Sequence, residues 1–182
     1  MSELLTFNND IMELIFQNID KESHLIVGLT CKEMYKILKA LYPNKKLIGS
    51  LKYLTSNLSL LKYGHINKCH WYSQTCRYAV MNGNLECLKY CHENGCPWYS
   101  QTCRYAVMNG NLECLKYCHE NGCPWQKDTC DLAAMNGHLE CLKYLHENGC
   151  LWNEWTCAYA AENGHLKCLK YLHENGCPWS EL

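Results

Sequence analysis

Cysteine and histidine are the residues of this 182-residue chain that are most capable of chemistry. Two short segments each bring together three cysteines and one histidine: Cys87, Cys91, His92 and Cys96, and then Cys114, Cys118, His119 and Cys123. Thiolates and imidazoles are the preferred ligands of zinc, so spacing of this density could bind a metal ion.

Nucleophilic catalysis would need more than these residue types. A cysteine or serine would have to lie beside a base, and a third group would have to orient that base in a concave pocket. Nothing in the sequence singles out one such set. We therefore expect no enzymatic activity and no catalytic residue.

The segments that carry these residues are copies of one another. Tryptophans recur every 27 residues, at Trp71, Trp98, Trp125, Trp152 and Trp179, and the block 71–97 is repeated letter for letter at 98–124. Blocks 125–151 and 152–178 vary the same text, 44–70 is a degenerate unit and 179–182 a remnant. A period of this size is typical of a solenoid, whose units are stabilised by stacking on their neighbours.

The copies favour a packing role for the cysteines. Cys91 and Cys118 are replaced by Leu145 and Leu172 in the later copies. Leucine preserves hydrophobic packing but removes a metal ligand, so cysteine behaves here as a small apolar residue. We therefore expect no metal and no cofactor, with zinc as the alternative, and no ladder of disulfides.

Each unit is predicted to form two helices. In block 125–151 these are about 127–136, ending at Gly137, and about 139–148, ending at Gly149, because glycine favours the left-handed conformation that ends a helix. The fold class predicted for residues 44–182 is thus an all-α helical repeat solenoid. Residues 1–43 are predicted to form a separate module.

The first helix of each unit has a constant side and a varied side. Thr129, Cys130, Ala133 and Gly137 do not change between copies, and they fall on one arc of the helix, which we expect to be buried. The opposite arc, here called the variable face, comprises Gln74, Arg77, Met81, Gln101, Arg104, Met108, Asp128, Asp131, Met135, Trp155, Ala158 and Glu162. This face is predicted to bind a partner protein, with Trp155 as a centre of binding energy.

The charges of the variable face change along the chain. Arg77 and Arg104 give way to Asp128, Asp131, Glu154 and Glu162. A binding surface that is basic near its start and acidic near its end would orient an elongated partner. Scattered, solvated charge is the alternative interpretation.

The second helix should bury its leucines and cysteines and expose a polar ridge of Glu140, Lys143 and Glu147. The recurring histidines His92, His119, His146 and His173 are expected to pack or to form hydrogen bonds. The periodic tryptophans suit anchors between neighbouring units. A stacking platform for nucleic acid is the alternative for them, but a net charge of -1 disfavours nucleic acid as a partner.

The repeat resembles the ankyrin repeat. The segment AAMNGHLECLKYLHENGC at 133–150 carries the resemblance through its paired alanines, its Gly-His turn and its Leu-rich second helix. Ankyrin units usually have about 33 residues and a projecting hairpin, so a 27-residue unit is expected to shorten the hairpin to a turn. The Cys-Pro-Trp junction is similar to that of ankyrin proteins of amoebae and giant viruses. The resemblance implies a protein-binding surface on the first helices.

The N-terminal segment has the spacing of three short helices, formed by 10–19, by the run 25–29 and by a helix that the capping box Thr30-Cys31-Lys32-Glu33 opens. It resembles an F-box, the module that docks on the Skp-type adaptor of cullin-RING ubiquitin ligases. The resemblance implies that the module's apolar positions pack it or contact the adaptor: Leu5, Ile11, Ile15, Phe16, Ile19 and Leu25. A plain cap on the solenoid is the alternative.

Together these features predict an adaptor that recruits a target protein to a cullin-RING ubiquitin ligase. A plain ankyrin scaffold or decoy is the second hypothesis, and a metal-binding or redox cysteine array is the third. The start of the chain does not resemble a signal peptide, and no stretch has the roughly 20 apolar residues that span a bilayer. We expect a monomer in the cytoplasm or nucleus, without a membrane partner.

Overall fold

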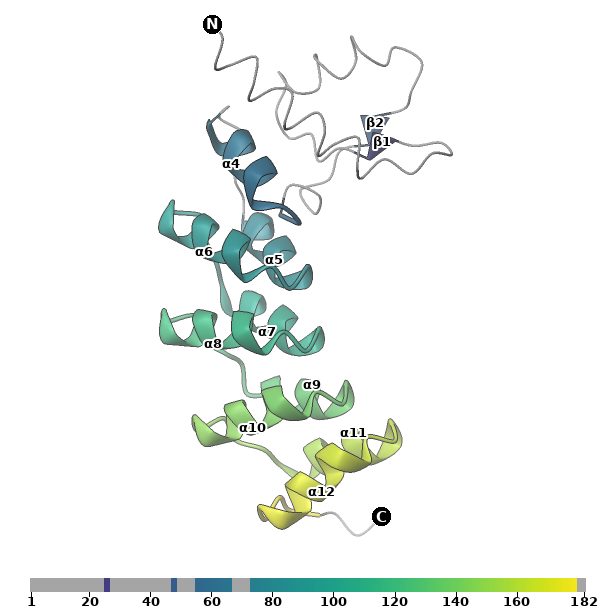
Figure 1. The fold of residues 1–182 in the computed structure, drawn as a ribbon. Helices are drawn as coiled ribbons and strands as arrows, with labels where there is room; N and C mark the ends of the chain where they lie inside the picture. The colour runs from purple at the N-terminus through teal and green to yellow at the C-terminus, as the bar shows by residue number, and fades with distance from the viewer. Residues whose placement is uncertain (1–24, 27–46, 49–54, 67–72, 180–182) are drawn as a thin grey trace, which may run out of the picture. The chain divides into compact units, whose positions relative to one another are not determined.

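The computed structural model describes residues 25–26, 47–48, 55–66 and 73–179, which are helical apart from two short strands and the connecting turns (Figure 1). The chain divides into unit 1, residues 1–96, and unit 2, residues 97–182. Unit 1 contains β1 (Leu25–Ile26), β2 (Leu47–Ile48), α4 (Leu58–Ile66), α5 (Ser73–Met81) and α6 (Leu85–Glu93). Unit 2 contains α7 (Ser100–Met108), α8 (Leu112–Glu120), α9 (Thr129–Met135), α10 (Leu139–Glu147), α11 (Glu154–Glu162) and α12 (Leu166–Glu174).

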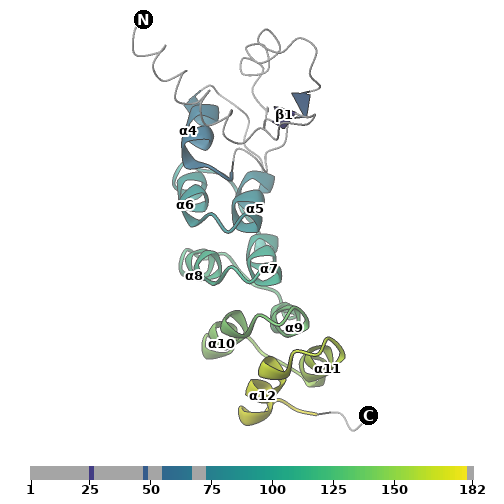
Figure 2. The same cartoon turned by 45° about the vertical axis from the view of Figure 1, so that its right-hand side comes forward.

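In unit 2 the helices form three stacked pairs. Helix α7 packs on α8, α9 on α10, and α11 on α12. Helix α9 also contacts both α7 and α11, while α10 contacts both α8 and α12, so first helices stack on first helices and second helices on second helices. Figure 2 shows the two stacks of unit 2 as separate columns. The predicted arrangement of paired helices is confirmed here.

In unit 1 the helix α5 packs on α6, and α6 contacts α4. Helix α4 begins at Leu58, which is 27 residues before the first residue of α6. Helix α4 is therefore the second helix of the degenerate repeat, residues 44–70. Asn57 precedes α4, and its side-chain oxygen accepts a hydrogen bond of 2.9 Å from the amide of Ser59, which satisfies a backbone donor at the helix start.

The core of unit 2 follows the constant side of each repeat. Thr129, Cys130 and Ala133 are buried on α9, as predicted, whereas Gly137 at the turn is only half-buried. Leu142 and Leu145 of α10 are fully buried against them. Burial of one leucine side chain stabilises a fold by about 1.5–3 kcal/mol. Each buried leucine therefore contributes to the stability of its helix pair.

A buried threonine organises the start of each first helix. In α9 the hydroxyl of Thr129 accepts a hydrogen bond of 3.0 Å from the amide of Gln126 and donates one of 2.7 Å to the carbonyl oxygen of the same residue. In α11 the Thr156 hydroxyl accepts a bond of 3.1 Å from the amide of Asn153. These bonds satisfy polar groups that would otherwise be costly to bury, which explains why the threonine is constant.

Aromatic side chains join successive repeats of unit 2. The rings of His146 and Trp152 stack with their centroids 3.6 Å apart, and His146 Nδ1 lies 3.1 Å from the hydroxyl of Tyr171 in the next repeat. His119 makes the same contacts one repeat earlier, with Trp125 and with the hydroxyl of Tyr144. The predicted roles of these tryptophans as anchors and of these histidines as packed, hydrogen-bonded rings are confirmed.

The turn between the two helices of a repeat requires glycine. Gly137 has a φ of +72°, and a Cβ atom there would lie 2.4 Å from Nδ1 of His165. The Nε2 atom of His165 lies 3.0 Å from the carbonyl oxygen of Met135, so this ring ties one turn to the repeat before it. Gly149, which ends α10, has a φ of +82°, but nothing lies within 4 Å of its Cβ position.

The glycine turn gives a matched pair of substitutions. Gly149→Ala should cost about 1–2 kcal/mol of unfolding free energy, because alanine strains the left-handed backbone. Gly137→Ala should cost about 1–3 kcal/mol more, since the His165 ring must also move. Urea unfolding of the two variants measures the difference. Equal losses would show that the close approach of His165 does not contribute.

The short connections agree with the expectation that the ankyrin hairpin is reduced to a turn. Residues 121–128 and 148–153, which join successive repeats of unit 2, contain turns and irregular backbone and no strand. The helices of unit 2 have nine residues each, apart from the seven-residue α9, and together with their turns and these short links they fill the 27-residue period.

The N-terminal prediction is corrected at two residues. Leu25 and Ile26, which we expected in the second short helix, form β1, and β1 pairs in parallel with β2 in the register Leu25 to Leu47 and Ile26 to Ile48. Ile26 and Val27 are β-branched and Gly28 follows, which favours extended backbone over helix. The other predicted adaptor-binding residues, Leu5, Ile11, Ile15, Phe16 and Ile19, lie outside the described residues. So does the predicted boundary at 43/44, which stays a prediction.

Among the described residues, no helix combines the length and the apolar character needed to cross a membrane.

Candidate functional site

The variable face lies on the first helices, and none of its twelve positions is buried. Five are exposed: Gln74, Gln101, Met108, Trp155 and Glu162. The other seven are half-buried: Arg77, Met81, Arg104, Asp128, Asp131, Met135 and Ala158. The constant threonine, cysteine and alanine on the opposite arc are buried, so the two arcs of each first helix differ in exposure as predicted, apart from the glycine at the turn.

In unit 2 the variable face is continuous across α7, α9 and α11, because these helices stack directly on one another. Arg104 of α7 forms an ion pair with Asp128, which precedes α9. The Thr156 hydroxyl at the start of α11 donates a hydrogen bond to the carboxylate of Asp131 on α9. Polar side chains therefore connect each first helix to the next.

These contacts modify the predicted change of charge. Asp128 neutralises Arg104, so unit 2 does not begin with a free basic charge on this face. Partial burial raises the pKa of Asp131, although the hydrogen bond from Thr156 lowers it in part. Glu154 and Glu162 are exposed on α11. The variable face is therefore acidic at its C-terminal end, where the exposed glutamates of α11 carry the charge.

The most prominent apolar side chain of the face is Trp155, whose relative exposure is 59%. Its ring is tilted against that of Tyr159, one helical turn further on, with 6.5 Å between the centroids. Tryptophan is enriched among the residues that dominate binding energy, because it buries a large rigid surface. Trp155 is thus the largest exposed apolar side chain of the variable face.

Two exposed side chains beside the face were missed by the sequence analysis. Tyr99, which precedes α7, is 61% exposed, and Leu151, which precedes α11, is 83% exposed. The signal for Leu151 was present, since Pro97 and Pro124 occupy its place in the other copies. An apolar side chain had replaced a turn residue there, and packing gives no reason for the change.

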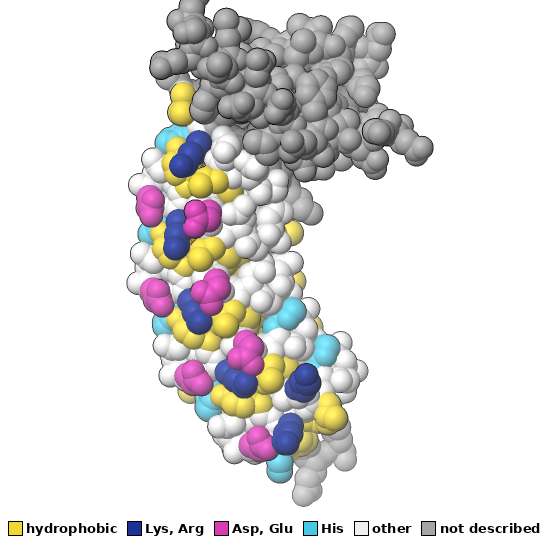
Figure 3. Space-filling model, viewed as in Figure 1, with side chains coloured by type: hydrophobic (Ala, Val, Ile, Leu, Met, Phe, Trp, Pro, Cys, Tyr) yellow, Lys and Arg dark blue, Asp and Glu magenta, His cyan; other side chains and the backbone are white. Residues whose placement is uncertain are grey.

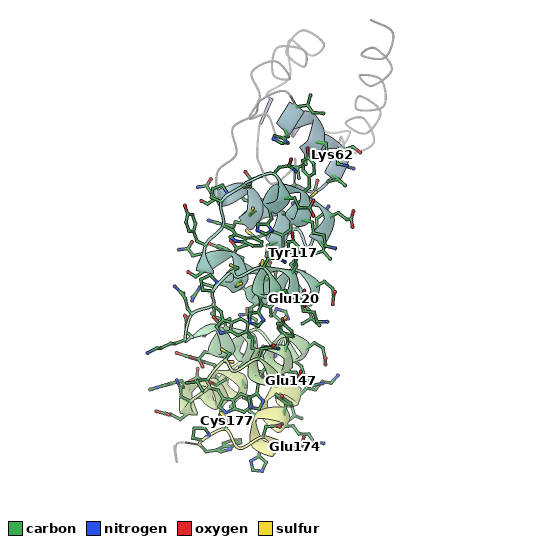
Figure 4. All side chains as sticks on the ribbon, turned by 90° about the vertical axis from the view of Figure 1, so that its left-hand side faces the viewer. Lys62, Tyr117, Glu120, Glu147, Glu174 and Cys177 are labelled. Carbon is green, nitrogen blue, oxygen red and sulfur yellow. The ribbon has the colours of Figure 1, made fainter. Side chains whose placement is uncertain are left out.

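The second helices present a different surface. Lys143 pairs with Glu140 at 2.9 Å and Lys116 with Glu113 at 3.1 Å, as the predicted polar ridge requires. Figure 3 shows lysine side chains beside acidic ones that recur along unit 2. Figure 4 shows Glu120, Glu147 and Glu174 at the same position of three successive repeats. The exposed side chains of the second helices are therefore nearly the same in every repeat. A partner protein could not use them to distinguish one repeat from another.

The cysteines are internal. The fourteen cysteines among the described residues are all buried, and none of these forms a disulfide. Burial raises the pKa of Cys87 to about 12 and the pKa of Cys114 and Cys141 to about 11, with a neighbouring glutamate adding to each shift. Such thiols stay protonated near neutral pH and are poor nucleophiles. This arrangement fits the predicted packing role.

The fold brings some cysteines together in a set that differs from the predicted one. Cys91 and Cys96 meet Cys76 of α5, not Cys87 or His92, and the three sulfur atoms lie within 4.8 Å of one another. The pKa of Cys96 is held well below its usual range, because the thiols of Cys76 and Cys91 donate hydrogen bonds to its thiolate. The next repeat forms the same group from Cys103, Cys118 and Cys123.

Comparison with known proteins agrees with the helical pairs. The family model for ankyrin repeats, which contains three copies of the repeat, matches residues 76–153 and 103–180. Together the matches cover residues 76–180, more than half of the chain. This chain belongs to the ankyrin-repeat family. Its first and second helices are those of ankyrin repeats, with the buried seam between them and the variable face on the first helices.

Among solved structures, the ankyrin-repeat chain is similar to the ankyrin repeat domain of human ASB11. The TM-score is 0.58 at 19% sequence identity, over 70% of this chain and 69% of that chain. The likeness confirms the predicted ankyrin-like solenoid. No curated protein sequence matches the chain. Ankyrin repeats are typically protein–protein interaction modules without enzymatic activity, so this protein contains an interaction scaffold.

Proposed function

We propose that the variable face of the repeats holds a target protein. The observation that carries this proposal is the difference between the two arcs of each first helix. The threonine, cysteine and alanine that stay constant between copies are buried, and the twelve positions of the variable face are exposed or half-buried. Packing does not require the second set to vary in this way. An exposed, varied surface on a rigid scaffold is suited to recognition of one particular partner.

We further propose that residues 1–43 form an F-box-like module that binds the Skp-type adaptor of a cullin-RING ubiquitin ligase. The support is the resemblance of DIMELIFQNI and of the following apolar run to that module. The protein would then act by proximity, bringing the target close to the ligase without chemistry of its own. Such a role places it in the cytoplasm or the nucleus, as a monomer in each ligase complex.

Co-purification with the Skp-type adaptor tests the ligase proposal. The wild-type chain should retain the adaptor, and a variant with Ile15→Asp and Phe16→Asp should lose it, because both changes put a charge into an apolar contact. A variant with Gln17→Asp and Asn18→Asp adds the same charge at neighbouring polar positions and should still bind. Failure of the wild type to retain the adaptor, or equal retention by the Ile15/Phe16 variant, would leave the plain ankyrin scaffold as the function.

A further inference from the structure

The two groups of three cysteines have the geometry of a metal site. Each group takes one sulfur from a first helix and one from a second helix, and the third follows the turn that ends the second helix: Cys76, Cys91 and Cys96 in unit 1, and Cys103, Cys118 and Cys123 in unit 2. A bond from thiolate to zinc is about 2.3 Å long, so three sulfurs around one ion lie about 4 Å apart. Sulfurs already within 4.8 Å reach that separation by small side-chain rotations.

The surroundings exclude most ions. Relative exposure is 0–4% for every cysteine of the two groups, so the sites are closed to water. Each group contains only sulfur, with no histidine and no carboxylate among the described residues. Hard ions such as Mg²⁺ and Ca²⁺ need oxygen ligands. A structural zinc site needs a fourth ligand, and neither group has one among the described residues.

A soft ion that accepts three sulfurs and nothing else fits these groups best. Soft thiolate ligands select Cu(I) over harder ions. We propose that each of the first two full repeats binds one Cu(I) ion through its three cysteine sulfurs, at the seam between the first and second helices. The ion enters as Cu(I) and stays Cu(I), and the thiols that bind it release their protons to solvent. The site is independent of the target-binding role of the variable face.

The third full repeat, residues 125–151, contains the same arrangement of cysteines with one sulfur fewer, so it can be compared directly with the three-cysteine groups. In block 125–151, Cys130 and Cys150 stand where Cys103 and Cys123 stand one repeat earlier, and Leu145 replaces Cys118. The thiol of Cys130 lies 3.7 Å from the carbonyl oxygen of Cys150, just as that of Cys103 lies 3.5 Å from the oxygen of Cys123. The same site is therefore present with two sulfurs instead of three. Leu145 and Leu172 are fully buried, so the fold accepts either residue at this position.

Anaerobic titration of the full chain with Cu(I), against a competing Cu(I) chelator, tests the proposal. Native mass spectrometry should show two tightly held ions per chain. X-ray absorption should show three sulfur neighbours for each ion. Cys91→Leu and Cys118→Leu should each remove one ion, because they install the residue of the later repeats. Cys87→Ala and Cys114→Ala, which change buried cysteines outside the groups, should leave two.

A variant that gains an ion separates loss of the binding site from loss of the fold, because an unfolded chain would not gain a site. Leu145→Cys should complete a third group with Cys130 and Cys150 and raise the number of ions to three. The proposal is overturned if Cys91→Leu and Cys118→Leu keep both ions, or if Leu145→Cys adds none. Coordination by two sulfurs, or tighter binding of Zn(II) with an added nitrogen or oxygen ligand, would overturn it as well.

Discussion

Replacement of Leu142 by alanine should lower the free energy of unfolding by about 2–5 kcal/mol, because it leaves a cavity in the seam of the third full repeat. Leu142 is completely buried on α10, and its helix contacts α8, α9 and α12. A repeat array is stabilised by contacts between neighbours, so a cavity in the middle of unit 2 weakens more than one pair. Urea unfolding followed by circular dichroism measures the loss.

Leu151→Ala is the matched control for this cavity. Leu151 is 83% exposed in the link before α11, so its removal should change the unfolding free energy by no more than about 0.5 kcal/mol. If both leucines cost the same, or if Leu142→Ala is nearly neutral, the second helices do not bury the side that the structure assigns to the core.

Trp155→Ala should weaken binding of the target protein by about 30-fold or more, which corresponds to the 2 kcal/mol typical of a central binding residue. The indole is more than half exposed, so the same change should affect stability little. Quantitative pulldown at several concentrations of the chain, with mass spectrometry of the retained proteins, gives the change in affinity for each of them.

Leu166→Ala serves as the control for Trp155→Ala. Leu166 is 74% exposed on α12, a second helix, and it lies outside the variable face. Its removal also deletes an exposed apolar side chain, yet it should leave target binding unchanged. A target lost equally from both variants would mean that exposed apolar surface in general, and not the variable face, holds the partner.

The helical pairs could be predicted from the sequence because each 27-residue copy repeats the same signals. Gly137 and Gly149 end their helices as expected, and α10 begins at Leu139 as predicted. Helix α9 begins at Thr129, two residues later than expected, because residues 127–128 form a turn; the Thr129 hydroxyl bonds to the backbone of Gln126 before this turn. The constant threonine was visible in the sequence, but this capping role was not.

Contacts between helices were harder to predict than the helices themselves. The sequence places Cys91 next to Cys87 and His92, whereas the fold brings it together with Cys76 from the other helix of the repeat. Likewise, Arg104 and Asp128 were assigned to opposite ends of a charge gradient, although stacking of α7 and α9 brings them into an ion pair. Periodicity shows which side of a helix is buried, but not which residue of the next helix it meets.

Site-specific photocrosslinking tests most directly the claim that the variable face binds the target. A photoreactive amino acid placed at Gln101 or Glu162 lies on exposed positions of this face, while the same residue at Glu120 or Glu147 lies on the exposed side of the second helices. We predict covalent adducts with one target protein from the first pair and none from the second. Adducts formed only from Glu120 and Glu147 would contradict the proposal that the residues which vary between repeats recognise the partner.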